Sequence, residues 1–282
     1  MGRSLRGQDV PEGLFLTFAE RPELDITKND QVAEAFAEHR PDIVINAAAF
    51  TDVDGAENNA QAAFAVNRDG PAALAGACRS SGAALIHLST DFVFDGKAGR
   101  PYKEDDVISP LSVYGKSKAE GEAVIAEIIE RHVIIRTSLV FSPYRNNFVK
   151  SILEQARNKD ELRVVDDQVG SPTPASDMAD ALLIVAAAVS GGKNEWGVFH
   201  YCGEPPLSRH DFAAAIIEAA GPNVDNSPRL LPAVSGDFPD AAARPAYSVL
   251  DCGRINRVFG IEQPGWRSAL PAVVDRCLRE GT

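Results

Sequence analysis

The chain has 282 residues, of which 45% are hydrophobic and 24% charged, a balance typical of a globular protein with a core of its own. Its formal net charge of −12 at pH 7 argues against nucleic acid or an anionic membrane as a partner. No apolar run reaches the length of a membrane span, and the first residues contain no apolar signal-peptide core. We therefore expect a cytoplasmic protein.

The first half of the chain predicts alternating strands and helices. The expected strands are the apolar runs 14–18, 42–49, 84–90 and 132–141, and the expected helices are 29–39, 58–80 with a break at Pro71, and 112–129. Continuous apolar runs, rather than strict alternation, are typical of strands covered on both faces by helices. The pattern predicts an α/β fold with a Rossmann-type doubly wound parallel sheet.

The second half has a different texture. Shorter strands (162–167, 198–203) and helices (176–189, 208–220, 267–279) alternate there with Pro- and Gly-rich joints. We expect residues 1–143 to form a dinucleotide-binding domain, interleaved with later segments such as 163–185. Residues 144–282 are expected to form mainly a smaller C-terminal α/β substrate-binding lobe.

The four cysteines lie far apart in the sequence and the five histidines are scattered. No Cys-x-x-Cys pair and no His-Glu-x-x-His motif is present, so we expect reduced thiols and no metal site built by the protein.

Tyr114 and Lys118 are the first candidates for chemistry. Residues four apart on a helix lie on the same face, and a lysine ammonium beside a phenol favours the phenolate and lowers its pKa. Such a tyrosine can give a proton to a carbonyl oxygen as a hydride arrives, while the lysine also holds the cofactor's ribose hydroxyls. The spacing alone is weak evidence, because Tyr-x-x-x-Lys also arises by chance.

Thr90 and Asp91 stand at the end of the expected strand 84–90, on the edge where open α/β sheets bind ligands. The Thr90 hydroxyl is placed to hydrogen-bond the same carbonyl oxygen. Ser, Thr and Asp are also common turn residues after a strand, so both interpretations stay open at this point.

Small side chains follow the preceding strand, at Ala47, Ala48 and Ala49. They let a cofactor approach the backbone, although alanine runs also serve simple packing. Asp25 follows the first apolar run, at a place suited to an adenine or ribose contact, or equally to a helix cap or a turn.

A series of ordered motifs runs through nearly the whole chain: LDIT (24–27), RPDIVINAAAFTDVDGAE (40–57), HLSTDFVFDG (87–96), SPLSVYGKSKAEGE (109–122), IIRTSLVF (134–141), NNFVKSIL (146–153), DQVGSPT (167–173) and ARPAYSVLD (243–251). This series resembles the dTDP-4-dehydrorhamnose reductases, the RmlD-type extended short-chain dehydrogenases/reductases. The resemblance implies NADPH- or NADH-dependent reduction of a 4-keto nucleotide sugar, dTDP-4-dehydro-L-rhamnose, to dTDP-L-rhamnose. It is also compatible with a homodimer.

The resemblance implies a role for particular residues. Tyr114 would be the general acid, Lys118 its partner, and Thr90 the hydroxyl that orients the carbonyl. Asp91 and Leu139 would contact the substrate, and Asp25, Ile26, Ala47, Ala48 and Ala49 would line the cofactor, together with Tyr114 and Lys118.

Two departures from the family pattern change these expectations. Leu139 stands where the family has a tryptophan, so a flat face for the sugar is missing. The family also begins with a strand and a glycine-rich turn that hold the cofactor's pyrophosphate, and Met1 to Leu5 resemble only the end of that turn. We expect a start codon assigned downstream of the true one rather than a truncated protein, and weak or absent NADPH binding by these 282 residues alone.

Two alternatives remain open. Nucleotide-sugar dehydratases and epimerases resemble this chain, but dehydratases carry a glutamate directly after the Thr-Asp pair, where this chain has Phe92. A non-catalytic protein, like the reductase-shaped regulatory subunit of methionine adenosyltransferase, fits the missing glycine turn and Leu139. It fits less well with the intact Thr90, Tyr114 and Lys118.

Overall fold

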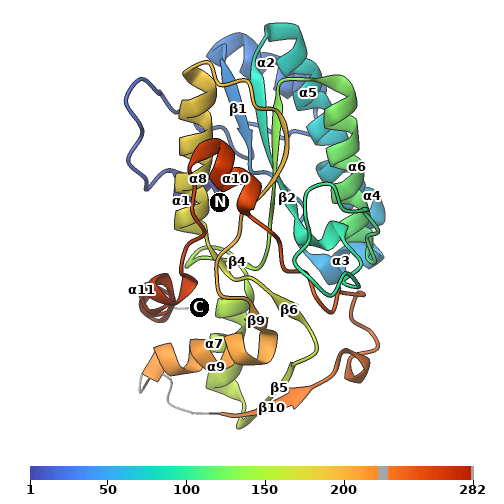
Figure 1. Cartoon of the computed structure of the whole chain (residues 1–282), viewed down its shortest axis with the longest axis vertical. Helices are drawn as coiled ribbons and strands as arrows, with labels where there is room; N and C mark the ends of the chain where they lie inside the picture. The colour runs from blue at the N-terminus through green and yellow to red at the C-terminus, as the bar shows by residue number, and fades with distance from the viewer. Residues whose placement is uncertain (222–227, 281–282) are drawn as a thin grey trace.

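The computed structural model describes residues 1–221 and 228–280, which form two regions stacked along the long axis of the molecule (Figure 1). The upper region is built on a four-stranded parallel sheet. Its strands lie in the order β1 (Ile43–Asn46), β2 (Ala84–Thr90), β3 (His132–Thr137) and β8 (Gly197–His200). The expected α/β fold with a parallel sheet is therefore confirmed.

Helices cover both faces of this sheet, because successive strand residues point to opposite sides. Leu85 and Ile134 face a core formed with α2 (Asn29–His39), α5 (Gly70–Ser81) and α6 (Val113–Ile128). Ile86 and Ile135 face a second core formed with α1 (Gly2–Leu5), α8 (Ala175–Ser190) and α10 (Gly253–Phe259).

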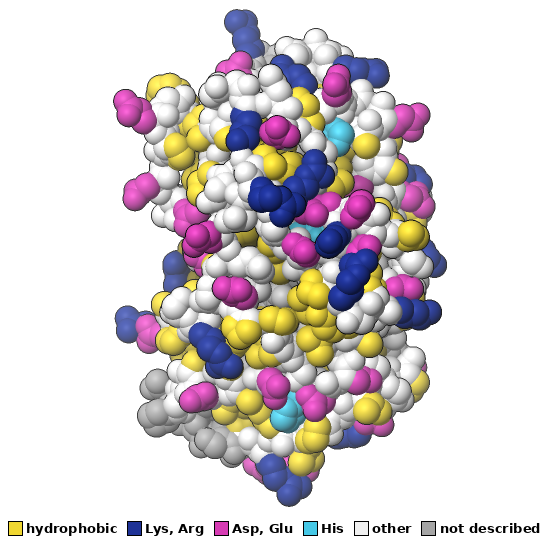
Figure 2. Space-filling view, in the orientation of Figure 1, with side chains coloured by type: hydrophobic (Ala, Val, Ile, Leu, Met, Phe, Trp, Pro, Cys, Tyr) yellow, Lys and Arg dark blue, Asp and Glu magenta, His cyan; other side chains and the backbone are white. Residues whose placement is uncertain are grey.

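The lower region has a core of its own. It is formed by α7 (Phe148–Asn158), α9 (Arg209–Ala220), α11 (Trp266–Arg279) and the parallel pair β5 (Glu161–Val165) and β10 (Arg229–Ala233). The Phe212 and Trp266 rings meet edge to face at its centre, with centroids 5.3 Å apart. On the face shown in Figure 2, apolar side chains gather across the middle of the molecule, and acidic and basic side chains are mixed elsewhere.

Short elements complete the chain. The two-residue strands β4 (Val140–Phe141) and β7 (Thr173–Pro174) pair in parallel, and β6 (Val169–Gly170) pairs with β9 (Leu207–Ser208) in antiparallel fashion. The remaining elements are α3 (Val53–Asn58), α4 (Ala60–Phe64), a π-helical turn η1 (Ala65–Asp69), and the 3₁₀ turns η2 (Asp91–Val93) and η4 (Ser235–Asp237). Among the residues with described positions, no helix is both long and apolar enough to cross a membrane.

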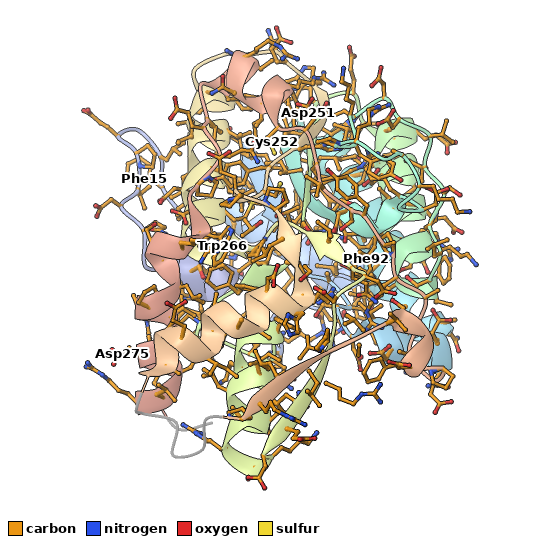
Figure 3. The ribbon with its side chains drawn as sticks, turned by 60° about the horizontal axis from the view of Figure 1, so that its bottom comes forward. Phe15, Phe92, Asp251, Cys252, Trp266 and Asp275 are labelled. Atoms are coloured by element: carbon orange, nitrogen blue, oxygen red, sulfur yellow. The ribbon has the colours of Figure 1, made fainter. Side chains whose placement is uncertain are left out.

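The strand predicted at 14–18 was wrong. This segment is irregular: Leu14, Leu16 and Phe18 pack against the upper core, whereas Phe15 is 97% exposed. Figure 3 shows Phe15 on an outlying loop, pointing away from the body of the molecule. The side chains of this segment are alternately buried and exposed, but its backbone forms no ladder of hydrogen bonds. The segment is therefore an irregular stretch of chain that packs over the core. Among the described strands, β1 therefore has a partner on only one side.

Two other expectations need correction. Residues 198–203 were placed in the smaller lobe, but β8 completes the upper sheet beside β3. The helix expected over 58–80 is divided into several pieces, and the break lies before Pro71 rather than at it. The π-helical turn η1 leads into α5, and Pro71 occupies the first turn of α5, where its missing N–H breaks no helical hydrogen bond.

Candidate active site

The start of α6 places Tyr114 and Lys118 at the carboxyl end of β2. Ser112 caps the helix, because its Oγ accepts a hydrogen bond from the Gly115 backbone N–H at 3.1 Å. A side chain at Gly115 would collide with the carbonyl oxygen of Phe92. The glycine therefore lets the helix lie against the turn that follows β2. Figure 3 shows Phe92 where the two regions meet.

Tyr114 lies against that same turn. Its ring meets the Phe92 ring edge to face, with centroids 6.0 Å apart. Burial raises the pKa of Tyr114 to about 12, a hydrogen bond with Thr90 acts in the opposite direction, and the Asp91 charge adds to the rise. The sequence predicted a lowered pKa, so the structure contradicts that expectation. The phenol is held in its protonated form.

Lys118 is not one of the groups that shift the pKa of Tyr114. Its side chain is 1% exposed, and its Nζ lies 2.6 Å from the Leu88 carbonyl oxygen and 3.2 Å from His87 Nε2. Burial lowers the pKa of Lys118 to about 8, against the opposing charge of Glu122. Among the described residues, Nζ makes no hydrogen bond to Tyr114. The lysine is thus turned toward the strand instead of acting as a fixed cation beside the phenol.

Asp91 is buried beside Thr90. One carboxylate oxygen accepts hydrogen bonds from Ser138 Oγ at 2.7 Å and Ser248 Oγ at 2.5 Å, and the other accepts one from Thr90 Oγ1 at 3.0 Å. Burial raises the pKa of this carboxyl, although each hydroxyl opposes the rise. Asp91 is 3% exposed, so its evident action is to orient the Thr90 hydroxyl next to Tyr114.

A narrow cleft opens beside these residues, lined by Phe92, Leu139, Gln168, Val169, Gly170, Arg209, Pro245 and Ser248. Leu139, predicted as a substrate contact, lies in this lining. It has a φ of 45°, a left-handed conformation that is uncommon for a residue with a side chain. The cleft thus joins residues of the upper region to residues of the lower one.

Arg209 was missed by the sequence analysis, because one arginine at the start of a helix carries no pattern of its own. Its Nε donates to Gln168 Oε1 at 3.0 Å, and its guanidinium lies over the Phe148 ring, 5.5 Å from the centroid. Burial and the neighbouring Arg244 lower its pKa to about 10, opposed by Asp91 and Asp54. Its two Nη atoms make no hydrogen bond to another described residue, so they are available to a ligand.

The residues predicted to line a cofactor fall into two groups. Ala47, Ala48 and Ala49 are partly or fully exposed where β1 ends, so the backbone can be approached there. Ile26 is buried in the core against Gly70. Asp25 accepts hydrogen bonds from the backbone N–H and hydroxyl of Thr27, which lower its pKa, and this geometry is that of a turn.

The exposed alanines and the Lys118 amine fit the ribose and nicotinamide half of a dinucleotide. With the Leu88 carbonyl oxygen and His87 as its two neighbours, the Lys118 ammonium keeps one N–H bond without a partner in the described part of the chain. A ribose hydroxyl is the type of group that such a donor takes.

One group of possible metal ligands occurs among the described residues. Atoms of Asp166, His210 and Asp211 lie within 4.8 Å of one another, and both carboxylates are exposed. Exposed acidic groups commonly lie this close without a metal, and we assign no ion to them.

A parallel sheet with a Tyr-x-x-x-Lys helix against its carboxyl edge and a threonine hydroxyl beside the tyrosine define a short-chain dehydrogenase/reductase-like protein. The particular family follows from the whole sequence. The family described as RmlD substrate binding domain matches residues 1–279, so the chain belongs to that family.

Relatives and solved structures agree with this membership. A protein of Aggregatibacter actinomycetemcomitans named dTDP-4-dehydrorhamnose reductase is 42% identical over 274 residues, covering 96% of this chain and 93% of that protein. The dTDP-4-dehydrorhamnose reductase structure from Clostridium acetobutylicum has a TM-score of 0.88 at 35% identity and covers 97% and 94% of the two chains. That from Bacillus anthracis, in complex with NADP, has a TM-score of 0.87 at 32% identity and covers 96% and 94%.

Proposed function

We propose that this chain is an NADPH-dependent dTDP-4-dehydrorhamnose reductase, which reduces dTDP-4-dehydro-L-rhamnose to dTDP-L-rhamnose. The observation that carries the proposal is the position of Tyr114, whose ring packs against Phe92 in the wall of the cleft and whose phenol has its pKa raised to about 12 by burial. A ketone reduction needs an acid at the carbonyl oxygen, and a phenol whose pKa is about 12 holds its proton until that oxygen becomes basic. The family membership and the names of the relatives support the same reaction.

The residues of the chain have separate tasks in this reaction. NADPH, when bound, would supply the hydride that the carbonyl carbon receives. Tyr114 gives its phenolic proton to the carbonyl oxygen, so the C=O bond becomes a C–OH and the tyrosine is left as a phenolate. The Thr90 hydroxyl donates to Asp91 in this structure, and it would position the carbonyl oxygen by a hydrogen bond once that O–H turns from Asp91 to the substrate. Lys118 and Ala47 to Ala49 would hold the cofactor's ribose and nicotinamide.

The nucleotide part of the substrate needs a cation, and Arg209 is suited to it. A guanidinium with unpartnered Nη atoms in a partly closed cleft matches a diphosphate, which accepts two parallel hydrogen bonds from such a group. We assign the lower region, with Gln168 and Arg209, to the nucleotide sugar. The upper region, with Tyr114 and Lys118, is assigned to the dinucleotide.

The thiols bear on the compartment. All four cysteines are free and buried, as expected for a protein kept under reducing conditions. Together with the nucleotide-sugar substrate, this supports a cytoplasmic enzyme.

The proposal is tested by mixing the purified chain with NADPH and dTDP-4-dehydro-L-rhamnose while absorbance at the NADPH band and sugar products are followed together. Because the sequence predicts weak NADPH binding by these 282 residues alone, the assay uses a large excess of NADPH, and we expect slow turnover in which equal amounts of NADPH are consumed and dTDP-L-rhamnose formed. A changed sugar without NADPH consumption would instead identify a dehydratase or an epimerase. Binding of dTDP without any turnover would identify a non-catalytic protein.

A further inference from the structure

Two serines that lie far apart in the sequence meet at the carboxyl group of Asp91. Ser138 directly follows β3 in the upper region, and Ser248 belongs to the segment 244–251 and lines the cleft. Both side chains are buried, and both hydroxyls donate to the same carboxylate oxygen, Oδ2, at 2.7 and 2.5 Å. Neither serine has a task in the reaction described above.

The backbone after β3 is shaped so that Ser138 faces Asp91. The next residue, Leu139, has a left-handed φ of 45° and lines the cleft. Thr173 holds this turn by two hydrogen bonds: its hydroxyl donates to the Ser138 carbonyl oxygen at 2.7 Å, and its N–H donates to the Leu139 carbonyl oxygen at 3.2 Å. A strained residue that the surrounding structure fixes in this way is typical of a functional site.

The segment 244–251 runs between the two regions and is held by both. On the side of β6, the Ser248 N–H donates to the Val169 carbonyl oxygen at 2.9 Å. On the side of the upper core, the Tyr102 N–H donates to the Val249 carbonyl oxygen at 2.8 Å. Backbone hydrogen bonds on both sides therefore fix the place where the Ser248 hydroxyl meets Asp91.

Gly170 leaves room for the two hydroxyls. A Cβ at this position would lie 3.2 Å from Ser138 Oγ and 3.3 Å from Ser248 Oγ, closer than an ordinary contact. A side chain here would therefore crowd both serines against Asp91.

Three hydroxyls thus converge on one carboxyl group. Thr90 donates to the second oxygen of Asp91, Oδ1, at 3.0 Å, and Thr90 Oγ1 also accepts from the Phe92 N–H at 3.1 Å. An ionised carboxylate can accept from all three hydroxyls, whereas the neutral acid has a proton of its own to donate. The ionised form therefore suits the whole set. It holds the Thr90 oxygen in one place, from which only the O–H has to turn toward a substrate.

We propose that Ser138 and Ser248 are positioning residues for the reduction, which act through Asp91 by keeping its buried carboxyl group ionised and thereby holding Thr90 in place. This inference rests on the proposed function. Burial raises the pKa of Asp91, and the hydrogen bonds from the two serines are the largest opposing effects, ahead of Thr90.

Two further groups face Asp91 from the packed helices. Arg209 of α9 favours the ionised carboxyl group through its charge. Tyr114 of α6 is a neutral phenol, and the Asp91 charge adds to the rise of its pKa. Because serine is uncharged, replacing it by alanine removes a hydrogen bond to Asp91 and leaves these groups in place.

The ionisation of Asp91 can be measured without turnover, from the ¹³C shift of its carboxyl group against pH in the cofactor-free chain. The signal is assigned from its loss in Asp91→Asn. We expect an ionised group at pH 7 in the wild type and a midpoint about one pH unit higher in Ser248→Ala, because one of the three donors to the charged form is lost.

Ser138→Ala removes the other donor to the same oxygen and should give a similar shift, so the test does not depend on one variant. A midpoint that neither substitution moves would overturn the inference. A wild-type Asp91 that is neutral at pH 7 would do so without any variant.

The effect on Thr90 is read from kcat for the keto sugar against pH, with a large excess of NADPH. Below both midpoints, kcat of Ser248→Ala should be lower than that of the wild type by up to about tenfold, the ratio that one pH unit sets. It should recover as the pH rises and Asp91 ionises, with little change in KM. Damage to the fold would not be repaired by pH.

Ser142→Ala is the matched control, because it removes a buried hydroxyl that donates to the Tyr144 carbonyl oxygen. It should keep the wild-type kcat at each pH. A Ser248→Ala enzyme with the wild-type kcat at every pH would contradict the positioning role. A wild-type chain that oxidises no NADPH would reject the proposed function instead, and the Asp91 titration would still decide whether the serines set its ionisation.

Discussion

At the scale of the residue, burial decides the chemistry of this site. Tyr114 and Lys118 have the spacing of a phenol–ammonium pair. Burial disfavours the charged form of each side chain, so it raises the pKa of Tyr114 to about 12 and lowers the pKa of Lys118 to about 8. The free-energy cost of removing a charge from water is larger than the stabilisation that the neighbouring groups provide. The result is an acid that stays protonated and a base that titrates near neutral pH.

His200 is a second buried histidine with both ring nitrogens satisfied in the neutral form. Nδ1 lies 3.1 Å from the Tyr102 carbonyl oxygen and Nε2 lies 3.3 Å from Arg136 Nη1. Burial, with the Arg136 charge, lowers its pKa to about 3. Because the unfolded chain binds this proton near pH 6.5, the stability contributed by neutral His200 is complete above that pH and is lost as the pH falls toward 3.

A glutamine at this position can make the same two bonds without titrating. We expect the free energy of unfolding of the wild type to fall by on the order of 2 kcal/mol more than that of His200→Gln between pH 7 and pH 5. Urea unfolding at the two pH values measures the difference. Equal losses in the two proteins would show that His200 takes up its proton in the folded state as readily as in the unfolded chain.

At the scale of the element, a buried ion pair joins α6 to the sheet. Glu122 follows Lys118 by one helical turn, and its carboxylate lies 2.7 Å from the Arg136 guanidinium of β3. Both side chains are almost fully buried, at 4% and 2% exposed. The pair therefore fixes the face of α6 that carries Tyr114 and Lys118.

Removal of one partner should be costly. We expect Arg136→Met to lower the free energy of unfolding by about 3–5 kcal/mol, because it leaves a buried carboxylate without a cation. The double variant Glu122→Gln/Arg136→Met should recover part of that loss, since no charge remains. Urea unfolding of the three proteins provides the measurement, and a cost below about 1 kcal/mol for Arg136→Met would mean that water reaches Glu122.

Sequence patterns predict the elements whose signals are local in the chain. The strand predicted at 84–90 and the helix predicted from 112 agree with β2 and α6, because a buried apolar run and a serine cap are local signals. The strand predicted at 14–18 was wrong because an irregular segment packed over the core can bury the same residues as a strand. His87 and Arg209 were missed because their roles depend on contacts with Lys118 and Gln168, which lie far away in the sequence.

At the scale of the whole molecule, the cleft lies between two cores. Leu139 reaches it from the end of β3, whereas Arg209 enters from the first turn of α9 in the lower region. A ligand that contacts both regions binds the folded protein alone and should stabilise it. We expect dTDP to raise the Tm in proportion to the logarithm of its concentration.

Arg209 should carry much of this effect. Hydrogen bonds to a charged group contribute about 1.5–3 kcal/mol, so Arg209→Met should weaken dTDP binding by about tenfold or more. Arg279→Met removes an exposed arginine at the end of α11 and should leave the affinity unchanged. Calorimetry with dTDP separates the two variants. Equal affinities would place the diphosphate elsewhere.

The central claim is that Tyr114 delivers the proton to the substrate carbonyl, and its most direct test is the rate of ketone-dependent NADPH oxidation by Tyr114→Phe. Loss of a general acid predicts a fall in kcat on the order of 10² or more. Tyr201→Phe is the matched control, because it removes a buried hydroxyl that donates to the Asp177 carbonyl oxygen, and it should retain the wild-type rate. A Tyr114→Phe enzyme that turns over as fast as the wild type would contradict the account.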